Sequence, residues 1–504
     1  MSDSGQRNAS PPGDVTRRDF LRSSAALAAL PGLGAQHDRQ QGGPGSARRR
    51  PNILIYISDQ FRWDVLSAYG LNPMHLTPNL DAMARRGTLF QSHVTNQPVC
   101  GPSRACLFTG QYQNKNGVWR NGLGLQSDTA TLATELRKSG YTANYVGKWH
   151  LAPTPPGTPN TPEARGPVAP EHRGGFDDFW QASNELEWTS HPYEGDLYDT
   201  NGKPIHFSGE YRVDFITGLA KQFLSTVREP FLLVVSQLEV HHQNDCNCFV
   251  APNGYAERYE NPFVPEDLKF FPGDWQKQLP NYYGSVASID HSIGELRSTL
   301  AHRGLEDDTI FLFLADHGCH FRTRNNEYKR SPHESSIHVP LVIQGPGFDR
   351  SLNIPEITTQ IDLTPTLLSA AGVPVPAGMQ GRSFLPLLDR KIDGWRNEAF
   401  IQISESQCGR ALRTPEWTYA VAASGGAKAS AAASGRYREE CLYNLFADPH
   451  ELLNLAGRRD DPKLVHGFGT PPQQAAAELR ERLLARMVEA GEAPAEIEER
   501  QVES

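Results

Sequence analysis

Short apolar runs alternate with helical segments along most of the chain after residue 50. The first run, Ile53 to Ile57, is almost continuously apolar, as expected for a strand buried on both faces of a sheet. Similar runs follow at residues 142–146, 231–236, 309–314 and 341–343. Helical candidates lie between them, at residues 78–86, 131–138, 214–226 and 282–302. This alternation predicts an α/β fold with a large, mostly parallel sheet covered by helices on both faces.

The pattern changes after about Asp389. Short strand candidates at residues 399–404, 411–413 and 418–422 precede a low-complexity Ala/Ser/Gly loop at residues 425–435, and a last helix is expected at residues 472–490. We therefore predict a main domain at residues 51–390 and a smaller α+β subdomain with a tail at residues 391–504.

The first fifty residues have the composition of a targeting segment. Thr16-Arg17-Arg18-Asp19-Phe20-Leu21 precedes an Ala-rich stretch that ends near Ala35. A short basic region, an apolar stretch and small residues describe an export signal, and the paired arginines are typical of the twin-arginine type. We predict an export signal at residues 1–35 and a linker at residues 36–50. The protein is then carried by the twin-arginine export machinery and is periplasmic or secreted.

Composition excludes several classes of protein. Lys and Arg number 49 against 58 Asp and Glu, a net charge of -9, so no nucleic-acid partner is expected. No run approaches the ~20 apolar residues of a membrane span. Seven cysteines are too few for a disulfide framework. Cys246 and Cys248 lack C-x-x-C spacing and have no second pair nearby, so we expect a loop with no metal or redox role there.

Polar side chains follow four of the predicted strands, at the ends where a parallel sheet collects its ligands. In chain order they are Asp59; Lys148 and His150; Glu239, His241 and His242; and Asp316 with His317. Carboxylates and an imidazole suit a metal ion, and a lysine with further imidazoles suits an oxyanion. An Asp after a strand is more commonly a turn residue, but the recurrence at several strand ends favours a site. We treat Glu239 and His242 as neighbours of that site.

Cys100-Gly101-Pro102-Ser103-Arg104 precedes an apolar helical turn, which predicts that Cys100 lies at a helix N-terminus. Free backbone N–H groups and the helix dipole favour an anion there. A buried structural cysteine is the alternative.

The same five residues, with Leu107, Thr109 and Gly110, resemble the signature of the type I sulfatases in the alkaline phosphatase superfamily. Further segments resemble the family in the same order: residues 51–59, 77–81, 147–151, 315–318, 329–340 and 442–455. The resemblance covers about residues 51–460.

This resemblance implies an alkaline-phosphatase-like fold, with a large mixed sheet between helices and a short antiparallel C-terminal sheet. It implies a sulfuric ester hydrolase that acts on a sulfated small molecule or glycan. Cys100 would be oxidised to formylglycine by a formylglycine-generating enzyme, and its hydrate would be the nucleophile. One hydroxyl of the hydrate attacks sulfur, and the other expels sulfate as the aldehyde reforms.

The resemblance also implies roles for the other residues. One divalent metal would be held by Asp59, Cys100, Asp316 and His317; Ca²⁺ is expected, with Mn²⁺ and Zn²⁺ as alternatives. Arg104 would steady the hydrated aldehyde, and Lys148 and His150 would hold it and the sulfate. His241 and Lys329 resemble the pair that binds sulfate and assists the leaving group.

Two positions depart from the family pattern. Gln60 stands where the family often has a second Asp, and His338 replaces the Arg before Val-Pro. The Asp-Gln pair with a later Asp-His also occurs in phosphonate or phosphodiester hydrolases and in choline-sulfatase-like enzymes. The leading hypothesis is an exported sulfatase for sulfated carbohydrates; the alternatives are such a hydrolase and an inactive glycan-binding homologue.

Overall fold

The larger of two sheets has eleven strands and forms the centre of the described chain. The computed structural model describes residues 50–154, 161–458 and 470–500, so the predicted export signal lies outside the described residues. The strands are β1 Asn52–Ser58, β2 Thr88–Val94, β3 Thr142–Lys148, β4 Phe179–Ser183, β5 Ser190–His191, β6 Glu194–Tyr198, β7 Pro204–Ser208, β8 Phe231–Gln237, β9 Thr309–Ala315, β10 His338–Gln344 and β11 Leu352–Thr359.

The strand order is β11-β2-β10-β9-β1-β8-β3-β4-β6-β5, and β7 pairs with β6. The five central strands, from β9 to β4, are parallel, whereas β10 runs antiparallel to both of its neighbours. Every residue of β1, β8 and β9 is buried, which is why these strands read as continuous apolar runs. The prediction of a large, mostly parallel mixed sheet is confirmed.

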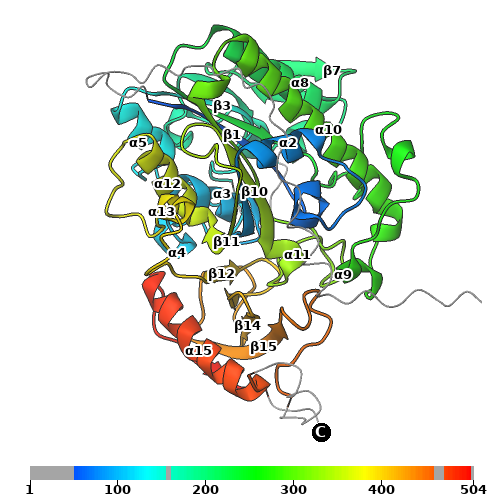
Figure 1. Ribbon diagram of the computed structural model, residues 1–504, viewed down its shortest axis with the longest axis vertical. Helices are drawn as coiled ribbons and strands as arrows, with labels where there is room; N and C mark the ends of the chain where they lie inside the picture. The colour runs from blue at the N-terminus through cyan, green and yellow to red at the C-terminus, as the bar shows by residue number, and fades with distance from the viewer. Residues whose placement is uncertain (1–49, 155–160, 459–469, 501–504) are drawn as a thin grey trace, which may run out of the picture. The chain divides into compact units, whose positions relative to one another are not determined.

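Helices cover both faces of this sheet (Figure 1). Leu54 and Tyr56 of β1 share a core with α2 Pro78–Arg86, α8 Arg212–Thr226 and α10 Trp275–His302. The alternate residues of β1 pack in a second core with α3 Cys100–Thr109, α5 Leu132–Lys138, α12 Leu363–Ala370 and α13 Leu385–Leu388. The short helices are α4 Gln113–Asn116, α6 Pro162–Arg165, α7 Leu186–Thr189, α9 Glu266–Lys269 and α11 Glu334–Ile337. Among the described helices, none has both the length and the apolar character needed to cross a membrane.

A smaller sheet follows in the C-terminal part of the chain. Its strands, in spatial order, are β12 Ala399–Ile403, β13 Gly409–Arg413, β14 Trp417–Ala423, β15 Arg436–Asn444 and β16 Glu496–Glu498. The first four are antiparallel, and β16 is parallel to β15. Helix α15 Pro472–Glu489 packs on it through Leu479, Leu483 and Met487. The expected C-terminal antiparallel sheet is therefore present.

Candidate active site

The ends of adjacent strands bring the predicted metal ligands together. Asp59 follows β1, and Asp316 and His317 follow its parallel neighbour β9. Cys100 begins α3, as predicted. One ligand atom from each of these four side chains lies within 4.8 Å of the others, and all four residues are buried.

The Cys100 Sγ atom lies among cationic and imidazole groups. The Lys329 Nζ atom is 2.9 Å from it, and the His317 Nε2 atom is 3.2 Å from it. Lys329 Nζ is also 3.1 Å from His241 Nε2. Burial and the Asp59 carboxylate act to raise the pKa of the thiol, but Lys148, Lys329 and His317 outweigh them and hold this pKa well below its usual range. The position is therefore suited to negative charge.

The two site carboxylates differ in their surroundings. The Lys148 ammonium is 2.8 Å from Asp59 and, despite burial, holds the pKa of that carboxyl well below its usual value. Burial and the charge of Asp59 raise the pKa of Asp316. The Arg104 guanidinium bridges them, at 3.1 Å from Asp316 and 3.4 Å from Asp59.

Helix α3 is fixed to the strand ends by its own first turn. Arg104 is fully buried and donates to the Lys148 carbonyl at 2.9 Å and to the Ser236 hydroxyl at 2.7 Å. The Ser103 hydroxyl donates to the Asp316 carbonyl at 2.7 Å. These contacts hold Cys100 against the carboxyl ends of β3, β8 and β9.

Glu187, in α7, belongs to the site although sequence reasoning missed it. Its Oε1 atom accepts a hydrogen bond from Lys148 Nζ at 3.0 Å and lies 3.6 Å from His150 Nδ1. Burial acts to lower the pKa of His150, but the Glu187 carboxylate raises it above its usual value. The signal was present in principle: β4 is the next parallel strand after β3, and α7 follows its carboxyl end. Recognising β4 would have found Glu187 by the strand-end argument.

Gln60 and His338, the two departures from the family pattern, lie in different settings. Gln60 has a left-handed backbone (φ 67°), and its N–H donates to Asp316 at 3.1 Å. Its Oε1 atom is buried and has no hydrogen-bond partner among the described residues. His338 instead stacks on Trp63, with ring centroids 4.0 Å apart, and contacts Glu334.

Glu239 and His242, which we treated as neighbours of the site, also lie in different settings. The Glu239 carboxylate is paired with the buried Arg212 guanidinium, so it is engaged in the fold. His242 lines the same cleft as His241, and its backbone carbonyl is 2.6 Å from His241 Nδ1.

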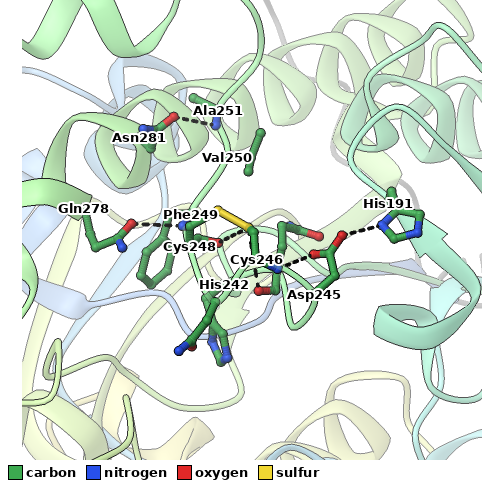
Figure 2. Close-up of a disulfide and its surroundings, with 12 residues drawn as sticks. His191, His242, Asp245, Cys246, Cys248, Phe249, Val250, Ala251, Gln278 and Asn281 are labelled. Carbon is green, nitrogen blue, oxygen red and sulfur yellow. Dashed lines mark hydrogen bonds and ion pairs between the residues drawn. A yellow bond between two sulfur atoms is a disulfide. The ribbon is translucent and has the colours of Figure 1, made fainter. Parts of the chain in front are cut away.

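The loop after β8 contains a disulfide that the sequence did not predict. Cys246 and Cys248 are bonded to each other, a pairing that the expectation of a loop with no metal or redox role did not include (Figure 2). The Gln243 N–H donates to the Cys248 carbonyl at 2.7 Å, and Asp245 pairs with His191 at 2.8 Å. The prediction considered only C-x-x-C pairs and metal clusters. A tight turn brings together two cysteines that are separated by one residue.

A cleft of about 830 Å³ opens beside these groups. Its lining includes Cys100, His150, His241 and Lys329 from the site. Ala429 and Ser430, from the low-complexity loop of the C-terminal part, also line it. The cleft is therefore built from both the main sheet region and the C-terminal region.

The sequence matches the sulfatase family over residues 51–373. The chain belongs to the sulfatase family. Residues 326–469 also match the family described as N-sulphoglucosamine sulphohydrolase, C-terminal. This sulfatase is thus a sulfuric ester hydrolase of the alkaline phosphatase superfamily, as the resemblance implied. Residues 14–34 match the twin-arginine translocation signal, which confirms the prediction of export.

Individual relatives agree with this assignment. An ulvan-active sulfatase from Formosa agariphila is 28% identical over 463 residues, covering 87% of this sulfatase and 83% of the relative. A solved structure in complex with its substrate D-glucosamine-2-N,6-O-disulfate superposes with a TM-score of 0.67 at 23% identity, covering 88% and 98% of the two chains. The phosphonate monoester hydrolase of Agrobacterium radiobacter superposes at 0.60 and 24% identity, covering 86% and 96%. At these identities the structural matches establish the fold.

Proposed function

We propose that this sulfatase hydrolyses sulfate esters of glycans with a formylglycine nucleophile made from Cys100. The observation that carries the proposal is the position of Cys100, which starts α3, lines the cleft and lies among Lys329, His317 and Asp59. The Sγ atom stands where the oxygens of a hydrated aldehyde would replace it. A formylglycine-generating enzyme is the partner that this modification requires.

Asp59, Cys100, Asp316 and His317 fit a divalent cation, and we assign it as Ca²⁺. Two buried carboxylates lie in one cluster, and burial together with the charge of Asp59 raises the pKa of Asp316, so a bound cation would stabilise its ionised form. Gln60 follows Asp59 in the chain, and its buried Oε1 atom, which has no hydrogen-bond partner among the described residues, is an oxygen of the kind that Ca²⁺ prefers. When bound, the cation supplies positive charge that stabilises the charge developing on the transferring sulfuryl group.

The remaining side chains handle charge and protons. Lys148 and Lys329 neutralise the sulfate oxygens, which otherwise repel a nucleophile. Burial and Lys329 lower the pKa of His241, so its neutral imidazole accepts from Lys329, which holds the proton for the leaving oxygen. Arg104 fixes the two carboxylates, and His150 assists expulsion of sulfate from the modified residue 100.

A sulfated glycan is the substrate class that the cleft supports best. The half-buried indole of Trp188 lines it and offers a flat apolar face to a sugar ring. The named substrates of the relatives, ulvan and a disulfated glucosamine, support the same class.

Parallel kinetics test this proposal against its alternative. Gln60, in place of a second Asp, favours phosphonate monoester or phosphodiester hydrolysis as the second candidate. We expect kcat/KM for a sulfated glycan or an aryl sulfate to exceed that for a phosphonate monoester and a phosphodiester, and Cys100→Ala to abolish turnover. Phosphodiester or phosphonate turnover far above that of every sulfate ester would establish the alternative.

A further inference from the structure

One arginine that lines the cleft has no acidic partner among the described side chains. Arg120 lines the cleft, is half-buried, and donates from its guanidinium to the Asn121 carbonyl at 3.1 Å. Among the side chains that the structure describes, which do not include that of Glu163, no carboxylate oxygen lies within 4.0 Å of this guanidinium. Residues 155–160, which follow the cleft residue Thr154 and are not described, contain no acidic side chain.

The other cations that line or adjoin the cleft either have acidic partners or lie at the nucleophile, where Lys329 is 2.9 Å from the Cys100 Sγ atom. Arg330 pairs with Glu327 and with Glu405. Lys148 pairs with Asp59 and Glu187. Arg120 is therefore the cleft arginine whose charge remains for a ligand.

The loop that carries Arg120 is fixed close to the nucleophile segment. The Asn121 Oδ1 atom accepts from the N–H of Gly101, the residue after Cys100, at 3.0 Å. The Asn121 N–H donates to Glu405 at 2.7 Å. Gly122 has a left-handed backbone and packs against Thr154, whose N–H donates to the Gly122 carbonyl at 3.0 Å. The backbone next to Arg120 is thus held in place by contacts of its two following residues.

The acidic residues of the cleft do not oppose an anion at Arg120. Glu187 and Glu405 are neutralised by their lysine and arginine partners. Glu185 accepts a hydrogen bond from the Thr154 hydroxyl at 2.9 Å.

We propose that Arg120 binds a second anionic group of the substrate. The natural substrate class is then a sulfated glycan that carries a further carboxylate or sulfate near the ester that is cleaved. The guanidinium fork matches the oxygens of either group, and a half-buried charge pair of this kind discriminates more strongly than an exposed one. This inference rests on the proposed function and deepens it.

The test uses one sulfated disaccharide in matched forms, with the full-length enzyme. The first form has a free uronate next to the sulfated sugar, the second has the same uronate as its methyl ester, and the third has a second sulfate instead of the uronate. A neutral aryl sulfate reports the reaction without a second anion. Arg120→Ala and Arg120→Lys are compared with Lys115→Ala, which removes an exposed lysine from the neighbouring helix α4.

We expect the wild type to prefer at least one anionic disaccharide over the methyl ester by about tenfold or more in kcat/KM, mainly through KM. The uronate and disulfate arms show which anion Arg120 selects. Arg120→Ala should erase the preference, Arg120→Lys should keep part of it, and Lys115→Ala should keep all of it. Added salt should weaken the preference of the wild type. Thermal midpoints of the variants confirm that they are folded.

Two results would overturn the inference. If the wild type does not distinguish the three disaccharides, then Arg120 does not select a second anion and the proposed function stands. The same conclusion follows if Arg120→Ala retains the preference while it hydrolyses the aryl sulfate. If the wild type cleaves none of the sulfate esters, including the aryl sulfate, both proposals fail.

Discussion

Lys148 shows how strongly the behaviour of one residue here depends on its neighbours. Its ammonium is fully buried, yet it stays charged because Asp59 and Glu187 lie 2.8 Å and 3.0 Å away. Burial acts to lower its pKa, and the two carboxylates raise it above its usual value. A buried charge is tolerated only when it is paired, so the three side chains act as a unit.

Replacing Glu187 tests that unit. Glu187→Gln keeps the shape but removes a charge-assisted hydrogen bond to Lys148, which is worth about 1.5–3 kcal/mol. We expect kcat/KM for sulfate esters to fall by roughly tenfold to a hundredfold, since 1.36 kcal/mol is about tenfold in a rate. Glu194→Gln, which changes an exposed residue in β6, is the matched control and should leave kcat/KM for sulfate esters unchanged. An unchanged rate for Glu187→Gln would remove this residue from the site.

The sequence anticipated much of this arrangement at the residue scale. The strand-end argument placed Asp59, Asp316 and His317 together, the resemblance added Cys100 as a ligand, and the structure brings all four side chains into one cluster. Glu187 was missed because β4 is short and has polar Gln181 and Ser183 in it, so it does not read as a buried strand. The contact of Glu187 with Lys148 depends on how distant segments pack together, which the local pattern of apolar and polar residues does not reveal.

Among the contacts between elements, Arg413 links the smaller sheet to α11, the short helix that leads into β10 of the larger sheet. It lies in β13 and pairs with Glu334 at the start of α11, at 2.9 Å, with both side chains nearly buried. Burial acts to raise the pKa of Glu334, but Arg413 and His338 hold it well below its usual value. Ionised Glu334 therefore stabilises the fold above its ordinary pKa, and this contribution is lost as the pH falls through its lower, folded-state pKa.

Arg413→Met should accordingly destabilise the protein most near neutral pH. Leaving Glu334 buried without this partner costs about 3–5 kcal/mol, and the cost shrinks in acid as the carboxyl becomes protonated. Thermal midpoints of the wild type and the variant, measured from pH 7 to pH 4, report the difference. Arg438→Met, which breaks an exposed pair with Glu498, should shift the midpoint little at any pH. An equal shift for both variants would show that the Glu334 pair is not special.

The disulfide loop offers a second prediction for an element. Asn244 lies in the turn between Gln243 and Cys248, whose backbones form an antiparallel β-bridge. Asn244 also lines the cleft. The double variant Cys246→Ser, Cys248→Ser removes the disulfide. Because this disulfide closes only a very short loop, its loss should lower the free energy of unfolding by at most about 1–2 kcal/mol. We expect a small change in the thermal midpoint and a several-fold rise in KM for a glycan, with less change for an aryl sulfate. An equal loss for both substrates would contradict a role in shaping the cleft.

The pattern of the chain predicted elements where burial is complete and failed where it is not. β1, β8 and β9 were found because their residues are apolar throughout. β2 was missed: it pairs between β10 and β11, but Gln91, Ser92 and His93 interrupt its apolar run. Helix α10 begins at Trp275, before the predicted start at Tyr282, because it continues through Pro280, which reads as a helix boundary.

At the scale of the whole molecule, metal loading should couple to stability. A cation that binds the folded site stabilises it by about 2.7 kcal/mol at a hundred times its Kd. We expect chelation to lower the unfolding midpoint and abolish sulfate release, and Ca²⁺ to restore both more fully than Mn²⁺ or Zn²⁺. Asp316→Asn should lose the Ca²⁺-dependent shift. If a chelator changed neither the unfolding midpoint nor the rate of sulfate release, this result would contradict a metal at Asp59, Cys100, Asp316 and His317.

Mass spectrometry of the peptide around residue 100 shows directly whether Cys100 is converted to formylglycine. Tryptic peptide 87–104 ends at Arg104 and contains this residue. Protein should be purified from its native host, or from cells that co-express a formylglycine-generating enzyme and modify a control sulfatase. We expect formylglycine at position 100 and sulfate release that rises with its occupancy. An unmodified thiol in fully active protein would contradict this expectation.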